Sequence, residues 1–565
     1  MSTLFSPAFV NTEEHAKPHP KRGFSLRDYQ REDADAIEAA WERGEKGVLA
    51  VQATGLGKSV MAAEIAANKP KGRRALVVVD SSALAQDLYR TIGKHTGDPP
   101  GILTGDMKAH WKEREIVVAT KQCLCTTDRR TQQPYYCGED WTGFDRVVID
   151  ESEAALADQY AAMVLHMRDE NPDIHTVGLT ATPLPANDRN IADMFPYVAD
   201  EPGPLYRDLQ WAYLNGWLVK PKQATVWTSM DFSNVKLRKN AQGEQDYSEA
   251  ELARLMLDQD EVQWIELANG IYERARNNTA IVVCPNNTQV ADRMAAYIEG
   301  AAREHGERDV AYSIHRSLGG SRSDDLMQRF KAGDFPIAVS VRMFEKGFDY
   351  DRVNMVVMAR RTKSLRLYTQ VAGRGTRPLT EIRGALGSEP DPNKRMSIIA
   401  ESRKPSCVIV DCVGVNDDAK DILGVIDILG RGVREDIRER VRANMLAKAS
   451  QEHEDASEAE ERDADDVGDE ARRAVAELKQ EREEELERER RARISAKVEV
   501  TWEEDDGTRT QRGKGFAQKP KRGTSSAKQV ALLVAMGIKP ESALGYSKKQ
   551  AGVIIGDKKS KGVAP

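Results

Sequence analysis

Long apolar runs are missing from this chain of 565 residues. None approaches the ~18 consecutive apolar residues of a membrane-spanning helix, so the sequence predicts no membrane segment. The first residues, Met1 to Phe5, also lack the charged start and the apolar stretch of a secretory signal peptide. We therefore expect a cytoplasmic protein.

Cysteine is scarce, with six residues in the chain. Half of them, such as Cys284 and Cys407, lie in or beside apolar runs, which indicates buried thiols. The other three, Cys123, Cys125 and Cys137, lie near one another but have no paired C-x-x-C spacing. This pattern favours ordinary thiols over a zinc site, without excluding the zinc site.

A strong charge of either sign is also absent. Lys plus Arg number 83 against 90 Asp plus Glu, a net charge of −7. This balance excludes a protein that binds nucleic acid through bulk positive charge, although a local basic groove stays compatible with it. The length predicts three or four units, because a single hydrophobic core rarely grows this large.

Short β-branched runs alternate with longer amphipathic stretches. Such alternation predicts parallel sheets flanked by helices, the α/β class. The expected strands of a first series are 48–51, 75–79, 116–119, 147–149 and 176–179, and those of a second series are 280–283, 337–341, 355–358 and 408–410. We therefore expect two α/β domains in tandem.

Composition sets the expected boundaries. Prolines such as Pro204 and Pro221 and the polar stretch 238–243 indicate a linker with a surface loop between the two domains. The expected parts are an N-terminal extension (1–23), a first domain (24–200), the linker (201–265), a second domain (266–416), a charged helical spacer (417–497), a second linker (498–523) and a small helical module (524–565).

The spacer and the tail each allow two interpretations. Acidic and basic residues four apart, such as Glu484 and Arg488, support an exposed helix, either a solvated spacer or a surface for a protein partner. Val498, Val500 and Trp502 suggest a short strand beyond it. The basic tail module is either a DNA-binding helical hairpin or a simple cap.

Glycines dominate the segment Ala53 to Ser59, which follows the expected first strand and precedes an Ala- and Met-rich stretch. Such a strand, loop and helix can wrap backbone N–H groups around phosphate oxygens. Lys58 would then contact the β- and γ-phosphates, and Ser59 would hold Mg²⁺. Gln52 stands where the strict loop pattern has glycine, so an ordinary glycine turn is the alternative.

Two acids, Asp150 and Glu151, follow the expected strand 147–149. Functional groups of parallel sheets gather at this end of the strands. Asp150 would bind Mg²⁺, and Glu151 would orient or deprotonate the water that attacks the γ-phosphate. Thr180 and Thr182 end the next strand and could hydrogen-bond toward these acids.

A pair of arginines, Arg374 and Arg377, lies in the second domain, at the start or along one face of an expected helix. Arginines in this position can reach a phosphate chain held by the first domain and neutralise charge that develops during transfer. An isolated pair would more often be a solvated surface.

These segments together resemble superfamily 2 helicases and translocases over roughly residues 24–415. The matching motifs, in order, are Arg27-Asp28-Tyr29-Gln30, Ala53 to Ser59, Ser81 to Leu84, Val118 to Gln122, Asp150 to Glu153, Thr180 to Thr182, Cys284 to Asn286, Lys346 to Asp349 and Gln370 to Arg377. The family's form of the glycine loop, A-x-T-G-x-G-K-[ST], does not require glycine at position 52.

The resemblance implies two RecA-like domains and a role for each matched motif. It implies ATP binding by Arg27, Gln30, Thr54, Gly55, Gly57, Lys58, Ser59, Gly347 and Asp349, with Mg²⁺ at Ser59 and Asp150. It implies catalysis by Glu151, Gln370, Arg374 and Arg377, and nucleic-acid contact or coupling by Ser81, Thr120, Gln122, Thr180 and Thr182.

Within that superfamily, two segments look like the DNA helicases related to type III restriction motor subunits and the RadD-like group. They are Gly203 to Tyr206 followed by Asn215 to Val219, and Met358 to Ser364. The last residue of the motif Asp150 to Glu153 is Glu153, where the family usually has His or Asp. This difference puts the coupling between the ATP site and the second domain in question. The tail has no P-D…(D/E)-x-K nuclease pattern.

The sequence thus predicts an ATP-dependent DNA helicase or translocase that uses ATP and Mg²⁺. The alternatives are an RNA helicase and an ATP-gated nucleic-acid clamp or assembly factor that does not unwind processively. Strand separation and duplex translocation are not distinguished.

Overall fold

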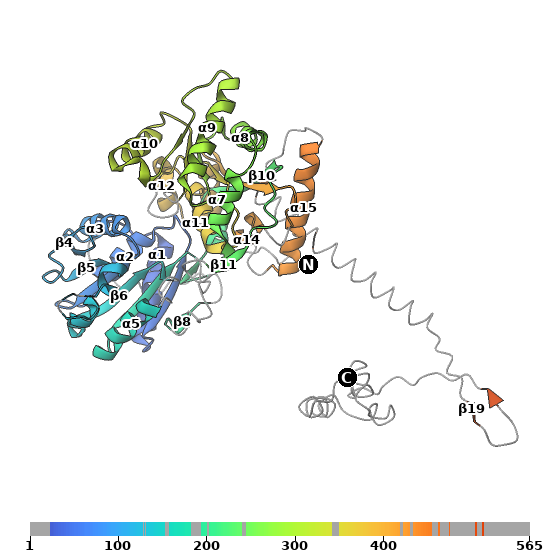
Figure 1. Cartoon of the computed structure of the whole chain (residues 1–565). Coiled ribbons are helices and arrows are strands. Elements are labelled where there is room, and N and C mark those ends of the chain that lie inside the picture. Colours follow the sequence, from blue (N-terminus) through green and yellow to red (C-terminus); the bar gives the residue numbers. More distant parts are fainter. Residues whose placement is uncertain are drawn as a thin grey trace. The chain divides into compact units, whose positions relative to one another are not determined.

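The computed structural model in Figure 1 describes residues 23–127, 129, 131–152, 158–181, 194–199, 203–239, 245–341, 350–418, 422–429 and 433–454, with short pieces at 462–463, 474, 503–504 and 511–512. The chain divides into two units, residues 1–478 and 479–565. Both tail helices expected from the sequence, and the strand expected at 498–502, lie outside the described residues.

The first sheet contains nine strands among the described residues. They are β1 (Gly47–Gln52), β2 (Arg74–Val79), β3 (Gly101–Leu103), β4 (Lys108–Ala109), β5 (Ile116–Thr120), β6 (Phe144–Asp150), β7 (His175–Thr180), β8 (Tyr197–Val198) and β9 (Tyr206–Arg207). Their order is β4-β3-β5-β2-β6-β7-β1-β8, with β9 also paired to β1. The five strands expected from the sequence are all present, and they pair in parallel.

Helices cover both faces of this sheet, which is why its strands read as continuous apolar runs. One face packs against α1 (Asp28–Glu42), α2 (Lys58–Ala67) and α3 (Ser82–Thr96). The other packs against α4 (Lys121–Cys125), α5 (Asp158–Glu170) and the 3₁₀ turns Tyr135–Gly138 and Trp141–Gly143. Figure 1 shows α2 and α3 on one side of the strands and α5 on the other.

The second sheet has the order β14-β15-β13-β16-β17-β10-β18 in the described part of the chain. Its strands are β10 (Lys220–Thr228), β13 (Ala280–Val283), β14 (Ala311–Ser313), β15 (Ile337–Ser340), β16 (Met355–Met358), β17 (Ser406–Gly414) and β18 (Arg462–Asp463). The four expected strands of the second series are present and parallel to their neighbours. The prediction of two tandem α/β domains is confirmed.

Alternate side chains of the second sheet enter two different cores. On β13, Ala280 and Val282 face one core, and Ile281 and Val283 face the other. The first core includes α7 (Glu249–Leu257), α8 (Glu261–Ala275) and α9 (Thr288–Glu304). The second includes α10 (Gly320–Ala332), which follows a 3₁₀ turn (Arg316–Leu318), and also α11 (Leu365–Gly375), α12 (Thr380–Ser388) and α13 (Pro392–Ala400).

The segment expected to be a linker, 201–265, is largely built into the two domains, so the prediction was wrong there. β9 joins the first sheet, and β10 pairs with β17 along nine residues of the second. The polar stretch contributes a hairpin of β11 (Leu237–Lys239) and β12 (Gln245–Tyr247). Pro221 misled the prediction, although a proline at the start of a strand is compatible with pairing. The crossing itself is residues 208–219, which include α6 (Leu209–Leu214).

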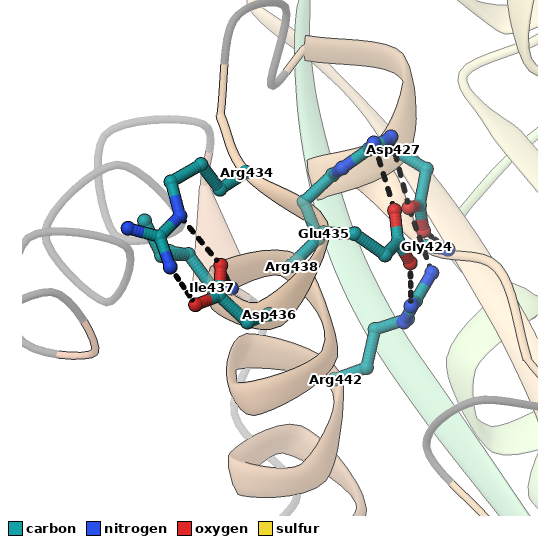
Figure 2. Close-up of polar contacts among 8 residues, drawn as sticks. All are labelled: Gly424, Asp427, Arg434, Glu435, Asp436, Ile437, Arg438 and Arg442. Atoms are coloured by element: carbon teal, nitrogen blue, oxygen red, sulfur yellow. Dashed lines mark hydrogen bonds and ion pairs between the residues drawn. The ribbon is translucent and has the colours of Figure 1, made fainter. Parts of the chain in front are cut away.

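Two helices after β17, α14 (Val425–Leu429) and α15 (Glu435–Glu454), are joined by an ion-pair cluster around the buried Asp427. Figure 2 shows Asp427 facing Arg438 and Arg442, with Glu435 beside the same arginines. Arg442 Nη1 lies 2.8 Å from Asp427 Oδ1, and Glu435 Oε1 lies 2.6 Å from Arg442 Nη2. Asp427 and Arg442 are both buried, so removing Asp427 would take from Arg442 its buried partner on α14. This ion pair therefore fixes α15 against α14.

The second unit contributes one described hairpin, β19 (Glu503–Glu504) with β20 (Gln511–Arg512). Within the described part of the chain, no helix has both the length and the apolar character needed to cross a bilayer.

Candidate active site

The glycine loop lies between β1 and α2, as the sequence predicts. Gly55 and Gly57 have φ values of +98° and +92°, a conformation that side chains with a Cβ rarely adopt. Gly57 is also the N-cap of α2, and no side chain caps that end. A ten-residue helix thus directs its N-terminal N–H groups and the positive end of its dipole at the loop. This backbone fits a phosphate chain.

Gln52, the departure from the strict pattern, has a structural role. Its side chain is fully buried, and Nε2 donates to Asp33 Oδ2 at 2.9 Å. Asp33 Oδ1 also accepts from Leu205 N (2.8 Å) and from Arg207 Nε (3.1 Å). Burial raises the pKa of Asp33, although Arg207 acts in the opposite direction. The residue at position 52 therefore joins α1 and β9 beneath the loop.

The segment matched to adenine recognition supports the loop from one side. Gln30 Nε2 and Tyr29 Oη both donate to the carbonyl of Leu56, at 3.0 and 2.5 Å. Gln30 Oε1 accepts from Arg27 N at 3.0 Å, which makes it part of the cap of α1. Both ends of the Gln30 amide thus make hydrogen bonds inside the protein, and its expected contact with the base stays a prediction.

Lys58 and Ser59 begin α2 and are half-buried. Lys58 Nζ donates to the carbonyl of Gln52 at 3.3 Å, across the mouth of the loop. An ammonium group on a flexible stem can exchange this carbonyl for phosphate oxygens.

The two acids lie at the carboxyl end of β6, next to the end of β7. Asp150 is the last residue of β6 and is paired in register with Leu179, while Thr180 is paired with Val51 of β1. Glu151 has φ +51°, an uncommon conformation for a residue with a side chain. Such backbone strain costs about 1–3 kcal/mol and gathers at functional sites.

Helix α11 of the second domain lies directly against the loop and the acids. Gln370 Nε2 donates to Glu151 Oε2 at 3.1 Å. A Cβ on Gly373 would lie 2.7 Å from Cβ of Thr54, and a Cβ on Gly55 would lie 3.2 Å from Cγ of Arg377. Three positions from Gln370 to Arg377 therefore contact the first domain, as the sequence predicts for an inter-domain site.

The expected placement of the two arginines along one helix was wrong. Helix α11 ends at Gly375, so Arg374 lies in its last turn and Arg377 lies beyond it. Pro378 follows, and a residue before proline is disfavoured in helical conformation. Arg374 is 8% exposed, and the stem of Arg377 packs near Gly55.

Residues expected to contact nucleic acid lie at the same edge of the first sheet, since Thr120 is paired with Val79 at the ends of β5 and β2. Ser81 caps α3 by accepting from Leu84 N, and exposed Gln122 donates to the carbonyl of Asp80 at 2.9 Å. Thr120 is only 3% exposed, so its hydroxyl lies inside the protein. Their role in binding stays a prediction.

Three predicted site residues, Thr182, Gly347 and Asp349, lie outside the described residues, as does Glu153.

Sequence reasoning missed the part of the site made by the crossing between domains. A Cβ on Gly55 would lie 3.0 Å from Cδ2 of Leu218, and Val219 N donates to the carbonyl of Thr376 at 2.7 Å. The crossing therefore touches both the glycine loop and the end of α11. Trp217 also stacks beneath the guanidinium of Arg395, 4.1 Å from its ring centre. The Asn215 to Val219 similarity marked this segment without showing its contacts.

Two protein-family models match this chain. One describes the res subunit of type III restriction enzymes and matches residues 23–184, and the other describes the helicase conserved C-terminal domain and matches residues 263–378. Over these residues the chain is similar to superfamily 2 helicases of the restriction-motor-like group. The expected pair of RecA-like domains is confirmed, because each model matches several strands of one of the two sheets.

Curated relatives include two named helicases and a restriction enzyme subunit. A Saccharomyces cerevisiae protein named as the ATP-dependent helicase IRC3 is 23% identical over 62% of this chain and 49% of its own length. DNA 3'-5' helicase XPB of Mycobacterium tuberculosis is 28% identical over 42% and 41%, and the type I restriction enzyme EcoAI endonuclease subunit of Escherichia coli is 24% identical over 63% and 44%. The chain spans about half the length of these relatives or less.

Proposed function

We propose that this chain couples ATP hydrolysis to movement along DNA, as a helicase or a translocase. The observation that carries the proposal is the contact of α11 with both the glycine loop and Glu151. Residues that bind phosphate, activate water and stabilise charge thus come from two domains that can separate and close.

The residues at the loop fit ATP with Mg²⁺. Gly55 and Gly57 provide the left-handed backbone, α2 provides the N–H groups of a helix start without a side-chain cap, and Lys58 provides a mobile positive charge. Ser59 and Asp150 provide the hydroxyl and carboxylate oxygens that Mg²⁺ prefers. Bound ATP with Mg²⁺ would supply the γ-phosphate as the group to be transferred to water.

Glu151 would accept a proton from that water, and Gln370 would fix the carboxylate by its hydrogen bond. Arg374 and Arg377 would stabilise the charge that develops on the transferred group, as arginine fingers do. Because these groups lie on opposite domains, hydrolysis requires closure, and release of products permits opening.

Ser81, Gln122 and the ends of β2 and β5 would contact the nucleic-acid backbone. Contacts to phosphate carry little sequence information and weaken with salt. We favour DNA, because one of the relatives named above is a DNA 3'-5' helicase and another is a restriction enzyme subunit. RNA stays the alternative substrate.

A second candidate is an ATP-gated clamp, favoured by the unusual Glu153 in the acid motif. A stepping motor hydrolyses many ATP molecules in each binding event, whereas a clamp holds DNA with ATP and releases it after one. The charged segment after α15 would then bind a protein partner. Counting ATP turnovers per DNA-binding event separates the two.

The proposal is tested by ATPase assays of the full chain with single-stranded DNA, duplex DNA and RNA. We expect DNA to stimulate hydrolysis and Lys58→Ala to remove the stimulated rate, by roughly 10²-fold or more. Lys71→Ala, an exposed lysine after α2, is the matched control and should behave as wild type. A wild-type rate that no nucleic acid changes, and that Lys58→Ala leaves intact, would refute the motor.

Unwinding and translocation need separate assays. Displacement of a strand from a tailed duplex reports unwinding, and displacement of a triplex-forming strand reports movement along duplex DNA. Activity in the second assay alone would make this chain a translocase.

A further inference from the structure

Lys404 lies in the loop between α13 and β17 and is 2% exposed. Its Nζ donates to two backbone carbonyls, that of Asp351 at 2.6 Å and that of Arg377 at 2.7 Å. A lysine is rarely buried this completely unless its ammonium group has partners. The two carbonyls show which backbone segments this lysine holds together.

The first partner, Arg377, follows the end of α11. Its carbonyl therefore has no partner within that helix, and the same holds for Thr376, whose carbonyl accepts from Val219 N at 2.7 Å. The backbone that carries the Arg377 side chain to Gly55 is thus fixed by donors from outside the helix. Lys404 is one of those two donors.

The second partner, Asp351, lies two residues after the predicted ATP-binding segment Lys346 to Asp349. Its carboxylate accepts from Thr380 N at the start of α12, and Arg383 Nη2 lies 3.9 Å from it. Although burial raises the pKa of Asp351, the hydrogen bonds from Thr380 lower it overall. The position of Asp351 is therefore fixed by its contacts with the start of α12.

We propose that Lys404 is a positioning residue for ATP hydrolysis, which keeps Arg377 at the glycine loop by tying its carbonyl to that of Asp351. The inference rests on the proposed function and adds a residue that does not touch ATP. With both hydrogen bonds in place, the backbone of Arg377 and that of Asp351 move together when the domains close. Without these hydrogen bonds, the guanidinium of Arg377 would be displaced from the charge that develops on the transferred phosphate group.

The strength of these two hydrogen bonds should depend on whether Lys404 is protonated. Burial lowers the pKa of Lys404 from 10.5 to about 8, and the groups facing it are Asp351, Arg377, Arg383 and the thiol of Cys407. Above that pH the amine is neutral, and its hydrogen bonds to the two carbonyls lose their charge assistance. Arginine at this position would stay charged throughout.

The experiment measures kcat and KM for ATP with the full chain and saturating DNA, between about pH 6.5 and 9.5. For Lys404→Met we expect kcat to fall about tenfold or more, with KM changed less than about twofold, because misplacement of a group lowers the rate more than it lowers binding. Lys404→Arg should recover most of the rate and keep it to higher pH than wild type. Lys394→Met, an exposed lysine of α13, is the control and should change nothing.

A double variant separates positioning from a loss of folding. If Lys404 acts through Arg377, Lys404→Met should add no further loss to Arg377→Ala. Additive losses would overturn the proposal, and so would a Lys404→Met variant with the wild-type rate. If Lys404→Met does not fold, the fall of kcat at alkaline pH decides the question. If kcat of Lys404→Arg falls at the same pH as that of wild type, the proposal is refuted.

Failure of the proposed function can be distinguished from failure of the inference about Lys404. If DNA stimulates no hydrolysis in wild type, both ideas fall. If Lys58→Ala removes the stimulated rate while Lys404→Met keeps it, only the inference about Lys404 falls.

Discussion

The two halves of the candidate ATP site are held in place by different means. The glycine loop takes its shape mainly from its own residues, since Gly55 and Gly57 adopt left-handed backbone and α2 begins at once, while Tyr29 and Gln30 brace it through the Leu56 carbonyl. Arg377 lies past the end of α11, and its position depends on Lys404 and on the bond between Val219 and Thr376. The first half is a local structure, and the second is assembled from segments far apart in the chain.

This difference predicts where substitutions at a distance will matter. A loop shaped by its own glycines tolerates change elsewhere, because local backbone preferences fix it. The arginine half should be sensitive at positions that never approach ATP, because small displacements of a charge-stabilising group cost large factors in rate.

The largest expected effect is that of Arg377→Ala. An arginine finger contributes about 10³-fold or more to kcat, so we expect a loss of that order with little change in nucleotide binding. Steady-state ATPase assays and titration with a fluorescent ATP analogue measure the two. Arg308→Ala, an exposed arginine, is the control. A small loss for Arg377→Ala would leave Arg374 as the group that matters.

A second comparison uses two glycines with similar backbone. Gly55 (φ +98°) lies against Leu218 and Arg377, whereas a Cβ on Gly72 (φ +79°) would meet nothing within 4 Å. Replacement by alanine should destabilise the fold at both by about 1–3 kcal/mol, because of the strained backbone. Only Gly55→Ala should also lower the ATPase rate, by about tenfold. Thermal unfolding and ATPase assays test this, and equal rates in the two variants would contradict it.

Gln52→Ala tests the support beneath the loop. Asp33 would lose the donor at 2.9 Å and stay buried, so the free energy of unfolding should fall by about 1–3 kcal/mol. The ATPase rate at low temperature should change less than about threefold, because the glycines still shape the loop. Gln289→Ala, on an exposed position of α9, provides the control for denaturant titrations. A selective loss of ATPase rate would assign Gln52 to the chemistry.

The last comparison concerns pH and the support of α11. Asp411 of β17 accepts from Tyr368 Oη of α11 at 3.1 Å and from Gln223 Nε2 at 2.7 Å. Burial raises the pKa of Asp411 from 3.8 to about 8. Between these values the folded chain keeps a proton that the unfolded chain has lost, so stability falls as pH rises, by up to about 1.4 kcal/mol per pH unit.

Asp411→Asn removes this titration and keeps an acceptor for both bonds. We expect its stability to depend less on pH between about 5 and 8 than that of wild type, measured by denaturant titration at each pH. Parallel curves for the two proteins would show that Asp411 does not hold the proton.

The sequence was sufficient to predict those parts of the fold and of the candidate site that depend on neighbouring residues. Apolar runs such as Val147 to Ile149 predict buried strands, and the sheet then brings their carboxyl ends together. The loop from Ala53 to Ser59 and the pair Asp150 and Glu151 are each an unbroken stretch of sequence that directly follows a strand, and the fold places them as expected.

The remainder depends on partners that are distant in sequence. Asp33 meets Arg207 across more than 170 residues, and nothing near either residue indicates the contact. Lys404 lies between Arg403 and Pro405 and reads as a surface loop, although it is buried. Pro221 signalled a loop, but pairing with β17 took precedence over that local preference.

The crossing between the domains contains a natural optical reporter. Trp217 is 4% exposed, with its ring 5.0 Å from the guanidinium carbon of Arg27 in the first domain and 4.1 Å from that of Arg395 in the second. Separation of the domains would remove one of these cations and admit water, which changes both the intensity and the colour of indole fluorescence. With the other seven of the eight tryptophans replaced by phenylalanine, closure could be timed in solution without an attached dye.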